Sequence, residues 1–159
     1  LLTIIIPRHI HRTKKIIEEI EDLGLNYHNH SSKNKIQNST EIYLVDTYGE
    51  TKSFFKICKT VFLGGSIIPH GGQNPLESIR FGCNIIHGPN VDNFKEIYAL
   101  LKNNKISRKI NNSNQLVKVL DQSFIRNVNY VKKIKKLKKI GSNILDNTYK
   151  EIEYYIKKT

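Results

Sequence analysis

Residues 61–89 carry the clearest chemical pattern of the chain, VFLGGSIIPHGGQNPLESIRFGCNIIHGP. The apolar run at its start predicts a buried strand, and the two glycine pairs after it let the backbone approach a ligand without intervening Cβ atoms. Asn74 then predicts an N-cap, with Pro75 at the first helical position, Glu77 placed to close a capping box, and Gly82 as the C′ residue. A glycine-lined loop entering a helix N-terminus offers N–H groups and a positive dipole end, which suit a phosphate.

Two further groups of candidate residues directly follow predicted strands. Pro7 fixes the backbone before Arg8, whose guanidinium at the carboxyl end of a strand can bind two phosphate oxygens. The alternative is a surface arginine that pairs with an acidic residue. Tyr48, Gly49 and Glu50 lie between a strand and a helix, where exposed amides can hydrogen-bond a nucleobase edge or a phosphate. The alternative there is an ordinary turn at the start of a helix.

Four other residues each keep two interpretations. Glu77 either caps its own helix or accepts hydrogen bonds from both hydroxyls of a ribose, as the acidic residue of dinucleotide sites does. Arg12 either contacts the ligand or supports its loop. Ser66 and His70, in the loop before Asn74, either contact a bound ligand or hold the shape of that loop.

Short apolar runs alternate with helical periodicity along the chain. Predicted strands cover residues 2–6, 25–29, 41–45, 61–63, 83–86 and 106–110, the last as an edge strand. Predicted helices cover residues 13–23, 51–59, 74–81, 93–101, 113–122 and 124–158, the last with a break at Gly141 and Ser142. We expect residues 2–6 to be buried on both faces of a parallel sheet. The alternation predicts a doubly wound α/β fold, in which ligands bind at the carboxyl ends of strands.

Histidines and cysteines could signal metal or redox chemistry. His9 with His11, and His28 with His30, form two His-x-His pairs, but neither pair has a carboxylate or cysteine at ligand spacing, so no metal site is expected. Cys58 and Cys83 lack the spacing of a disulfide framework. They are interpreted as buried thiols in a reducing compartment.

The net charge of +12 is concentrated at one end of the chain. Residues 126–159 contain ten Lys and Arg against three Asp and Glu, a net +7, which leaves +5 for the other 125 residues. Within this tail, residues 130–140 predict an amphipathic helix with a basic face, either solvated or lying near anionic lipid. No apolar stretch approaches the roughly 20 residues that span a bilayer, and no signal peptide is visible.

The motifs described above closely resemble those of the 3-deoxy-D-manno-octulosonic acid (Kdo) transferases of lipopolysaccharide synthesis. The resemblance lies in GGSIIPHGGQNPLE followed by FGCNIIHGPNVDNFKEI, in residues 7–12, which resemble the family's PRHxxR, and in residues 46–50, which resemble its DTxGE. It covers the C-terminal half of such an enzyme, and a start without methionine that leads almost directly into a strand suggests an excised fragment.

The resemblance implies the C-terminal half of a GT-B glycosyltransferase, with Rossmann-like domains. Residues 1–125 would bind the nucleotide sugar, and the helices of residues 126–159 would pack on that domain and reach toward the N-terminal domain. The residues implied to contact CMP or the donor are Pro7, Arg8, Tyr48, Gly49, Glu50, Asn74, Pro75, Leu76 and Glu77. Arg12, Ser66 and His70 are further donor or loop-support candidates, and no metal or other cofactor is expected.

The family's activity implies an inverting transfer of Kdo from CMP-Kdo to a lipid A precursor. The general base would be a glutamate of the N-terminal domain, so no catalytic residue is assigned in this fragment and we expect it to be inactive alone. The implied location is the cytoplasmic face of the bacterial inner membrane, either peripheral or anchored through the N-terminal part. Alternatives are a GT-B domain for another nucleotide sugar, such as a UDP-sugar, or a basic nucleic-acid or membrane-surface binding module. Nucleic acid is not expected as a partner.

Overall fold

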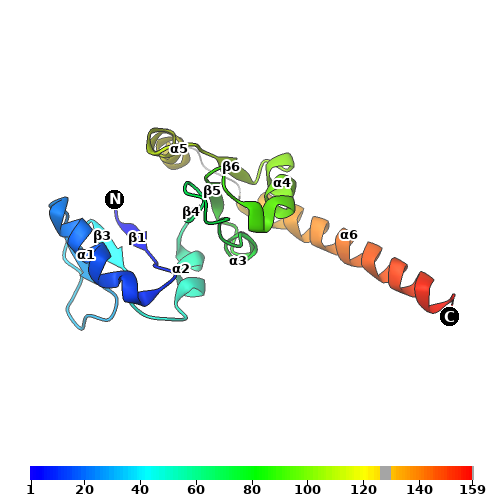
Figure 1. Cartoon of the computed structure of the whole chain (residues 1–159), viewed down its shortest axis with the longest axis horizontal. Helices are drawn as coiled ribbons and strands as arrows, with labels where there is room; N and C mark the ends of the chain where they lie inside the picture. The colour runs from blue at the N-terminus through cyan, green and yellow to red at the C-terminus, as the bar shows by residue number, and fades with distance from the viewer. Residues whose placement is uncertain (126–129, 159) are drawn as a thin grey trace. The chain divides into compact units, whose positions relative to one another are not determined.

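The computed structural model describes residues 1–125 and 130–158, and these form two compact units, Leu1–Phe54 and Phe55–Thr159. Each unit is built on a ladder of three parallel strands (Figure 1). The predicted division after residue 125 coincides with the end of a helix, but as a domain boundary it stays a prediction.

Unit 1 contains the strands β1, β2 and β3 in the order β1-β3-β2, so β3 is the central strand. Its elements are β1 (Thr3–Ile5), the 3-10 helix η1 (Ile10–Arg12), α1 (Thr13–Asp22), β2 (Tyr27–Asn29), β3 (Ile42–Leu44) and the start of α2 (Thr51–Ile57). Each strand lies within a predicted one. Residues 31–39, which lie between two predicted strands, form no helix or strand.

The burial of the unit 1 strands follows their place in the ladder. Ile42 and Leu44 of the central strand are buried, as is Val45 directly after it. β1 has one hydrogen-bonded neighbour, and its residues Ile4 and Ile5 are only half-buried. The prediction that the first apolar run is buried on both faces is therefore not met, since Ile4 and Ile5 both stay partly accessible.

Unit 2 contains a second parallel ladder in the order β4-β5-β6, with β6 at an edge as predicted. Its elements are β4 (Thr60–Leu63), α3 (Leu76–Arg80), β5 (Asn84–His87), the 3-10 helix η2 (Asp92–Phe94), α4 (Lys95–Asn103), β6 (Ser107–Lys109), α5 (Ser113–Ile125) and α6 (Tyr130–Ile156). Figure 1 shows α4 and α5 on opposite sides of β6, the arrangement of a doubly wound fold.

One apolar cluster holds unit 2 together. Its buried members come from β4, β5 and the helices around them: Phe55, Leu63, Ile79, Cys83, Ile85, Tyr98, Leu101 and Ile106. Burial of such side chains is the main favourable term in folding, at about 25 cal/mol per Å² of apolar surface. The cluster therefore fixes β4 and β5, whose carboxyl ends carry the glycine-rich loop and the sequence HGP.

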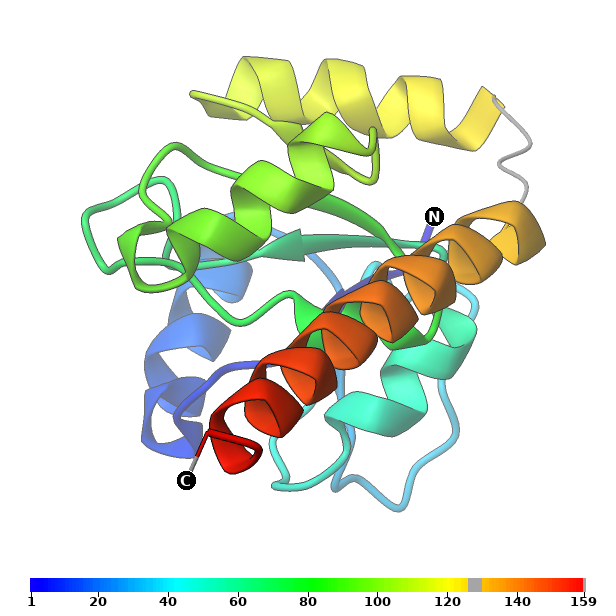
Figure 2. The same ribbon diagram turned by 90° about the vertical axis from the view of Figure 1, so that its right-hand side faces the viewer.

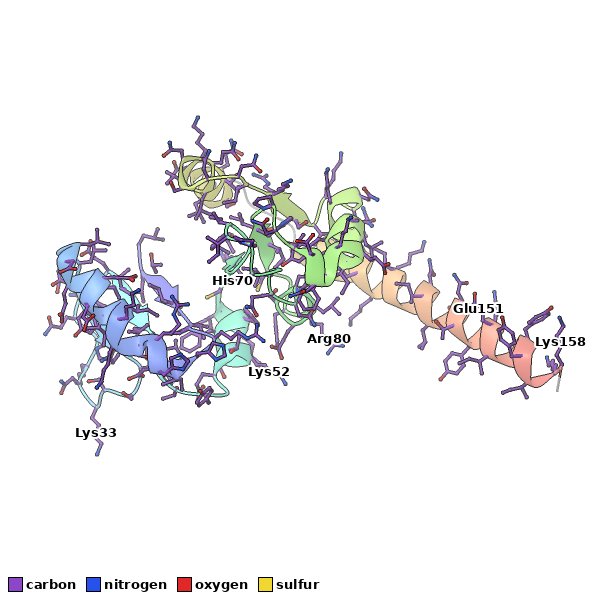
Figure 3. All side chains as sticks on the ribbon, in the orientation of Figure 1. Lys33, Lys52, His70, Arg80, Glu151 and Lys158 are labelled. Atoms are coloured by element: carbon purple, nitrogen blue, oxygen red, sulfur yellow. The ribbon has the colours of Figure 1, made fainter. Side chains whose placement is uncertain are left out.

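The long helix α6 runs without interruption through Gly141 and Ser142, so the predicted break there is wrong. A glycine inside a helix costs about 1 kcal/mol relative to alanine, which its helical neighbours can offset. Figures 1 and 2 show α6 (orange to red) as one continuous helix, and Figure 3 labels Glu151 and Lys158 toward its C-terminal end. Among the described residues, no helix is both long and apolar enough to cross a membrane.

The described part of the predicted basic segment packs as an amphipathic helix. Leu137 is half-buried against the apolar cluster, and the lysines at 135, 136, 138 and 139 are exposed, with Lys136 Nζ donating to the Asn104 carbonyl at 3.3 Å. These contacts agree with a solvated face on a helix packed against its domain. Residues 126–129, and the side chains of residues 130–134, lie outside the described part of the structure.

Candidate functional site

The carboxyl ends of β1 and β3 bring two predicted groups to the same edge of unit 1. The strands are parallel neighbours with Ile5 opposite Leu44, and the Val45 N–H donates to the Ile5 carbonyl at 2.9 Å. Arg8 follows β1 after two residues, and residues 48–50 follow β3 after three. Since parallel strands end at one edge of their sheet, unit 1 carries both groups where α/β proteins bind ligands.

Arg8 and Arg12 extend from the segment that joins β1 to α1. Arg8 is exposed and follows the half-buried Pro7, while Arg12 is exposed and ends the helix η1, its N–H donating to the His9 carbonyl at 3.1 Å. Among the described residues neither guanidinium forms an ion pair. The alternative of a surface arginine paired with an acidic residue is therefore not observed for Arg8.

The turn after β3 begins helix α2. Gly49 has φ +86°, and the Glu50 carbonyl accepts hydrogen bonds from the N–H groups of Ser53 at 2.9 Å and Phe54 at 3.3 Å. Tyr48 is 74% exposed, so its side chain lies open to solvent within unit 1. The turn does lead into a helix, and the Tyr48 and Gly49 backbone lies in an exposed turn, so the ligand contact and the ordinary helix start both stay open.

Asp46, the first residue of the motif that resembles DTxGE, anchors a neighbouring loop. Its Oδ1 accepts the Ser31 N–H at 2.8 Å and its Oδ2 accepts the Ser31 hydroxyl at 2.5 Å. Partial burial raises the pKa of Asp46. The hydrogen bonds from Ser31 and the charge of the nearby His30 lower it by more, so the pKa stays below its usual 3.8. Asp46 therefore joins β3 to the start of the loop after β2.

The histidines of both pairs pack against neighbouring rings. His9 and His11 stack on each other with centroids 5.4 Å apart, and His28 stacks on Tyr43 at 5.5 Å. His30 Nδ1 lies 2.8 Å from the Tyr43 hydroxyl oxygen. In the part of the chain that the structure describes, no group of three or more His, Cys, Asp or Glu is placed to hold a metal ion.

In unit 2, Ser66 ties the glycine-rich loop to the end of β5. Its hydroxyl donates to the Leu63 carbonyl at 2.6 Å and accepts the Gly88 N–H at 2.8 Å, while its own carbonyl accepts the Asn90 N–H at 2.9 Å. Ser66 is 0% exposed. A Cβ at Gly88 would collide with the Ser66 carbonyl group. These contacts are those of a residue that holds the loop shape, the second of its two interpretations.

Further backbone hydrogen bonds fold the remainder of this loop. The Gly72 N–H donates to the Gly65 carbonyl at 3.0 Å, and the Asn93 N–H donates to the Gly71 carbonyl at 3.3 Å. His70 is exposed on the same loop, where Figure 3 labels it. The glycine pairs therefore lie in a closed and internally bonded loop, and His70 keeps both of its interpretations.

The segment from Asn74 to Glu77 begins helix α3. Asn74 Oδ1 accepts the Leu76 N–H at 3.0 Å, so its side chain caps the start of the helix as expected, but Pro75 stands directly before the first helical residue, Leu76, and the prediction of Pro75 at the first helical position is wrong by one residue. The Leu76 N–H is thereby satisfied within the chain. Pro75 is buried, Leu76 is 43% exposed and Glu77 is half-buried. Asn74 Nδ2 is the remaining hydrogen-bond donor of that side chain.

Helix α3 ends as the sequence predicts but is short. The Gly82 N–H donates to the Ile79 carbonyl at 2.8 Å and the Cys83 N–H donates to the Ser78 carbonyl at 3.2 Å, a Schellman motif with Gly82 at φ +79°. The helix has five residues. Few peptide dipoles are aligned in so short a helix, so its positive end is weaker than the sequence led us to expect.

The predicted residues divide between the two units. Unit 1 brings together the strand-end group Pro7, Arg8, Arg12, Tyr48, Gly49 and Glu50, and unit 2 brings together Ser66, His70, Asn74, Pro75, Leu76 and Glu77. Within each unit the group lies where a parallel strand ends or in the loop that follows it. The prediction that both groups grip one ligand stays a prediction.

Sequence reasoning did not single out two buried residues beside the unit 2 loop. Tyr98 on α4 donates its hydroxyl to the Gln73 carbonyl at 2.9 Å, and the His87 ring packs on Tyr98 with centroids 4.3 Å apart. His87 Nδ1 donates to the Gly88 carbonyl at 2.7 Å. Burial and, to a lesser degree, the charge of Lys109 lower the pKa of His87. The feature of the sequence that could have drawn attention to this pair is a histidine at the end of a predicted buried strand.

The two cysteines are free thiols. Cys83 is buried and its thiol lies within hydrogen-bond distance of the carbonyls of Phe55, at 3.4 Å, and Cys58, at 3.2 Å. Cys58 is half-buried, and burial raises the pKa of its thiol, which disfavours the reactive thiolate. The buried-thiol interpretation is confirmed for Cys83.

Comparison with known proteins finds relatives that share one description. No protein-family model matches it. The chain is 31% identical over 158 residues to the 3-deoxy-D-manno-octulosonic acid transferase of Rickettsia felis, which covers 96% of the chain and 32% of that relative. It is 32% identical over 101 residues to the transferase of the same name from Haemophilus influenzae, covering 64% of the chain and 24% of the relative.

A solved structure agrees with these relatives. The crystal structure of the C-terminal CMP-Kdo binding domain of WaaA from Acinetobacter baumannii superimposes with a TM-score of 0.81 at 26% identity, covering 88% of this chain and 73% of that one. The chain is a homologue of the Kdo transferases. The predicted α/β fold, that of the C-terminal half of a GT-B glycosyltransferase, is confirmed by this match. The chain spans only about a third of the length of the Rickettsia felis relative.

Proposed function

We propose that this chain is the donor-binding part of a Kdo transferase and that its ligand is CMP-Kdo. The observation that carries the proposal is the likeness, with a TM-score of 0.81, to a domain described as binding CMP-Kdo. The strand-end groups of both units lend support, because they stand where α/β proteins bind nucleotides. The uridine-nucleotide alternative has no comparable observation in its favour.

In this proposal each unit supplies a different kind of contact. The exposed Arg8 pairs bidentately with the donor phosphate, and the turn of residues 48–50 offers backbone hydrogen bonds to the nucleotide. The Asn74 amide and the neighbouring backbone approach the phosphate from the glycine-rich loop. Glu77 accepts hydrogen bonds from the ribose hydroxyls. Charge that develops on the departing CMP is thereby neutralised, which is where transition-state stabilisation is required.

The complete enzyme would transfer Kdo to a hydroxyl of a lipid A precursor with inversion at the anomeric carbon. The bond from that carbon to the acceptor oxygen forms as its bond to the CMP phosphate breaks, and a glutamate base of the N-terminal part takes the acceptor proton. No residue of this chain is given that role, and no metal or other cofactor is required. The chain alone should therefore release no CMP from CMP-Kdo above the uncatalysed rate; catalysed turnover would refute this part of the proposal.

With a lipid acceptor, the complete enzyme would work at the cytoplasmic face of the bacterial inner membrane, either peripheral or anchored through its N-terminal part. The exposed lysines of α6 supply positive charge that suits an anionic membrane surface. Binding of the chain to anionic and neutral vesicles would test this contact. Equal binding to both would remove the electrostatic contribution.

Calorimetry with CMP and UMP tests the donor assignment. We expect CMP to bind the chain more tightly than UMP, and tighter binding of UMP would overturn the assignment. A second comparison, CMP against 2′-deoxy-CMP, tests the ribose contact. Glu77→Gln should bring the two affinities closer together, since a carboxylate accepts from two hydroxyls better than an amide does. An unchanged ratio would return Glu77 to a purely structural role.

A further inference from the structure

Tyr98 joins helix α4 to the residue that precedes the proposed donor-binding segment. Its side chain is 2% exposed, and its hydroxyl donates to the Gln73 carbonyl at 2.9 Å. Gln73 comes directly before Asn74, whose side chain caps α3. Since the hydroxyl bonds to a backbone atom 25 residues earlier in the chain, it fixes where the loop enters that segment.

The ring of Tyr98 is itself held in place by its neighbours. His87, which is 5% exposed at the carboxyl end of β5, packs on it with centroids 4.3 Å apart and an interplanar angle of 47°. Tyr98 also belongs to the apolar cluster of unit 2. Burial raises the pKa of Tyr98 well above its ordinary value, so the phenol keeps its proton and remains a hydrogen-bond donor.

The other bonds of the loop act farther from Asn74. The Ser66 hydroxyl and carbonyl fix the start of the loop to Gly88 and Asn90, and Asn93 bonds to Gly71. The Tyr98 hydroxyl acts at the last residue before Asn74. A phenylalanine would fill the same space in the cluster, so the hydroxyl is not needed for packing. Its role is specific to the Gln73 carbonyl.

We propose that Tyr98 is a positioning residue, which sets the donor-binding segment Asn74–Glu77 through its hydrogen bond to the Gln73 carbonyl. The inference rests on the proposed function of that segment and goes beyond it, because Tyr98 lies in the core of unit 2 and is not among the residues assigned to touch the donor. It also identifies His87 as the side chain that orients the phenol ring.

The test is Tyr98→Phe in the 159-residue chain, with CMP and 2′-deoxy-CMP as probes in calorimetry below the melting temperature. We expect CMP to bind about five- to tenfold more weakly, the loss typical of one hydrogen bond. The affinity ratio of CMP to 2′-deoxy-CMP should fall as Glu77 shifts. That ratio is independent of the fraction of folded protein, so a mere loss of stability leaves it unchanged.

Tyr27→Phe is the matched control, because it removes a tyrosine hydroxyl that donates to Glu21 Oε1 at 3.0 Å in unit 1. It should leave both the affinity and the ratio as in the wild type. Unchanged affinity and ratio in Tyr98→Phe would overturn the positioning role, as would a Tyr98→Phe chain that no longer folds, since the hydroxyl would then serve the whole fold. Absence of CMP binding by the wild-type chain would instead refute the proposed function.

Discussion

Units 1 and 2 share a three-stranded parallel ladder but present their strand-end residues in different ways. In unit 1, Arg8, Arg12 and Tyr48 are exposed, and their segments are held mainly by backbone hydrogen bonds. In unit 2, the buried Ser66 ties the loop after β4 to the end of β5, and Tyr98 ties it to the interior of α4. Unit 1 therefore offers exposed charge, whereas unit 2 offers a backbone held by buried hydrogen bonds.

This difference suggests a division of labour in the proposed binding of CMP-Kdo. An exposed guanidinium contributes affinity through charge and adjusts its rotamer as the ligand arrives. A loop fixed by buried hydrogen bonds contributes specificity, because its groups are oriented before binding. Changes at exposed side chains such as Arg8 should therefore alter affinity with little effect on stability, whereas changes that disturb the unit 2 loop should also alter stability.

The largest effect is expected from Gly88→Ala. The new Cβ would collide with the Ser66 carbonyl, so β5 and the loop must separate, at a cost of about 3 kcal/mol in the free energy of unfolding. Hydrogen exchange should accelerate at β5 and the loop while β3 keeps its protection. Gly64→Ala is the control, since its Cβ would meet no atom within 4 Å. An equal loss of hydrogen-exchange protection in both units would show that the effect of the new Cβ is not confined to β5 and the loop.

Arg8→Ala should have the next largest effect, and it should fall on binding. Loss of a charge-assisted pair with the phosphate is worth about 2 kcal/mol, or roughly thirtyfold in the Kd for CMP. The melting temperature should stay constant because Arg8 is exposed. Arg108→Ala removes the same charge from an exposed position in β6 and serves as the control. Similar Kd values for the two variants would remove Arg8 from the donor site.

Gly49→Ala should cost less, about 1 kcal/mol of stability, as expected for an L-residue forced into positive φ. A Cβ at Gly49 would meet no atom within 4 Å, so the effect comes from the backbone alone, in contrast to Gly88. Gly49→Asn should recover most of the loss, because asparagine tolerates this region better. Chemical denaturation followed by circular dichroism would measure both. Equal destabilisation by Ala and Asn would point to packing instead.

The smallest effect is a difference in acid sensitivity. The pKa of His87 in the folded chain is lowered from 6.5, so this histidine takes up a proton at a higher pH in the unfolded chain than in the folded one. Unit 2 therefore loses stability as the pH falls below about 6.5. The pKa of Asp46 is lowered from 3.8, so its contribution in unit 1 is retained until the pH falls below about 4. Hydrogen exchange between pH 7 and 4 should therefore show β5 loosening before β3. Loss of protection at β3 first would contradict this order.

Much of the local structure was predictable because it depends on residues close in sequence. Asn74, Pro75 and Gly82 mark the start and end of α3 through hydrogen bonds that span a few positions, from the Asn74 side chain at the start and from the backbone at the end. The predicted break at Gly141 was wrong because it considered only the local helix penalty. A penalty of about 1 kcal/mol does not break a 27-residue helix. The strand-end positions of Arg8 and Tyr48 followed from the alternation of apolar runs with helical patterns.

By itself, the sequence determined the order of strands and helices, the helix caps and the residues that resemble the donor motifs of Kdo transferases. Only the tertiary structure decided that Ser66 is bonded to Gly88, 22 residues later, and that Tyr98 reaches the Gln73 carbonyl. It also decided that β1 is an edge strand in unit 1. The physical reason is that such contacts depend on which segments pack together, whereas capping and periodicity depend on neighbours along the chain.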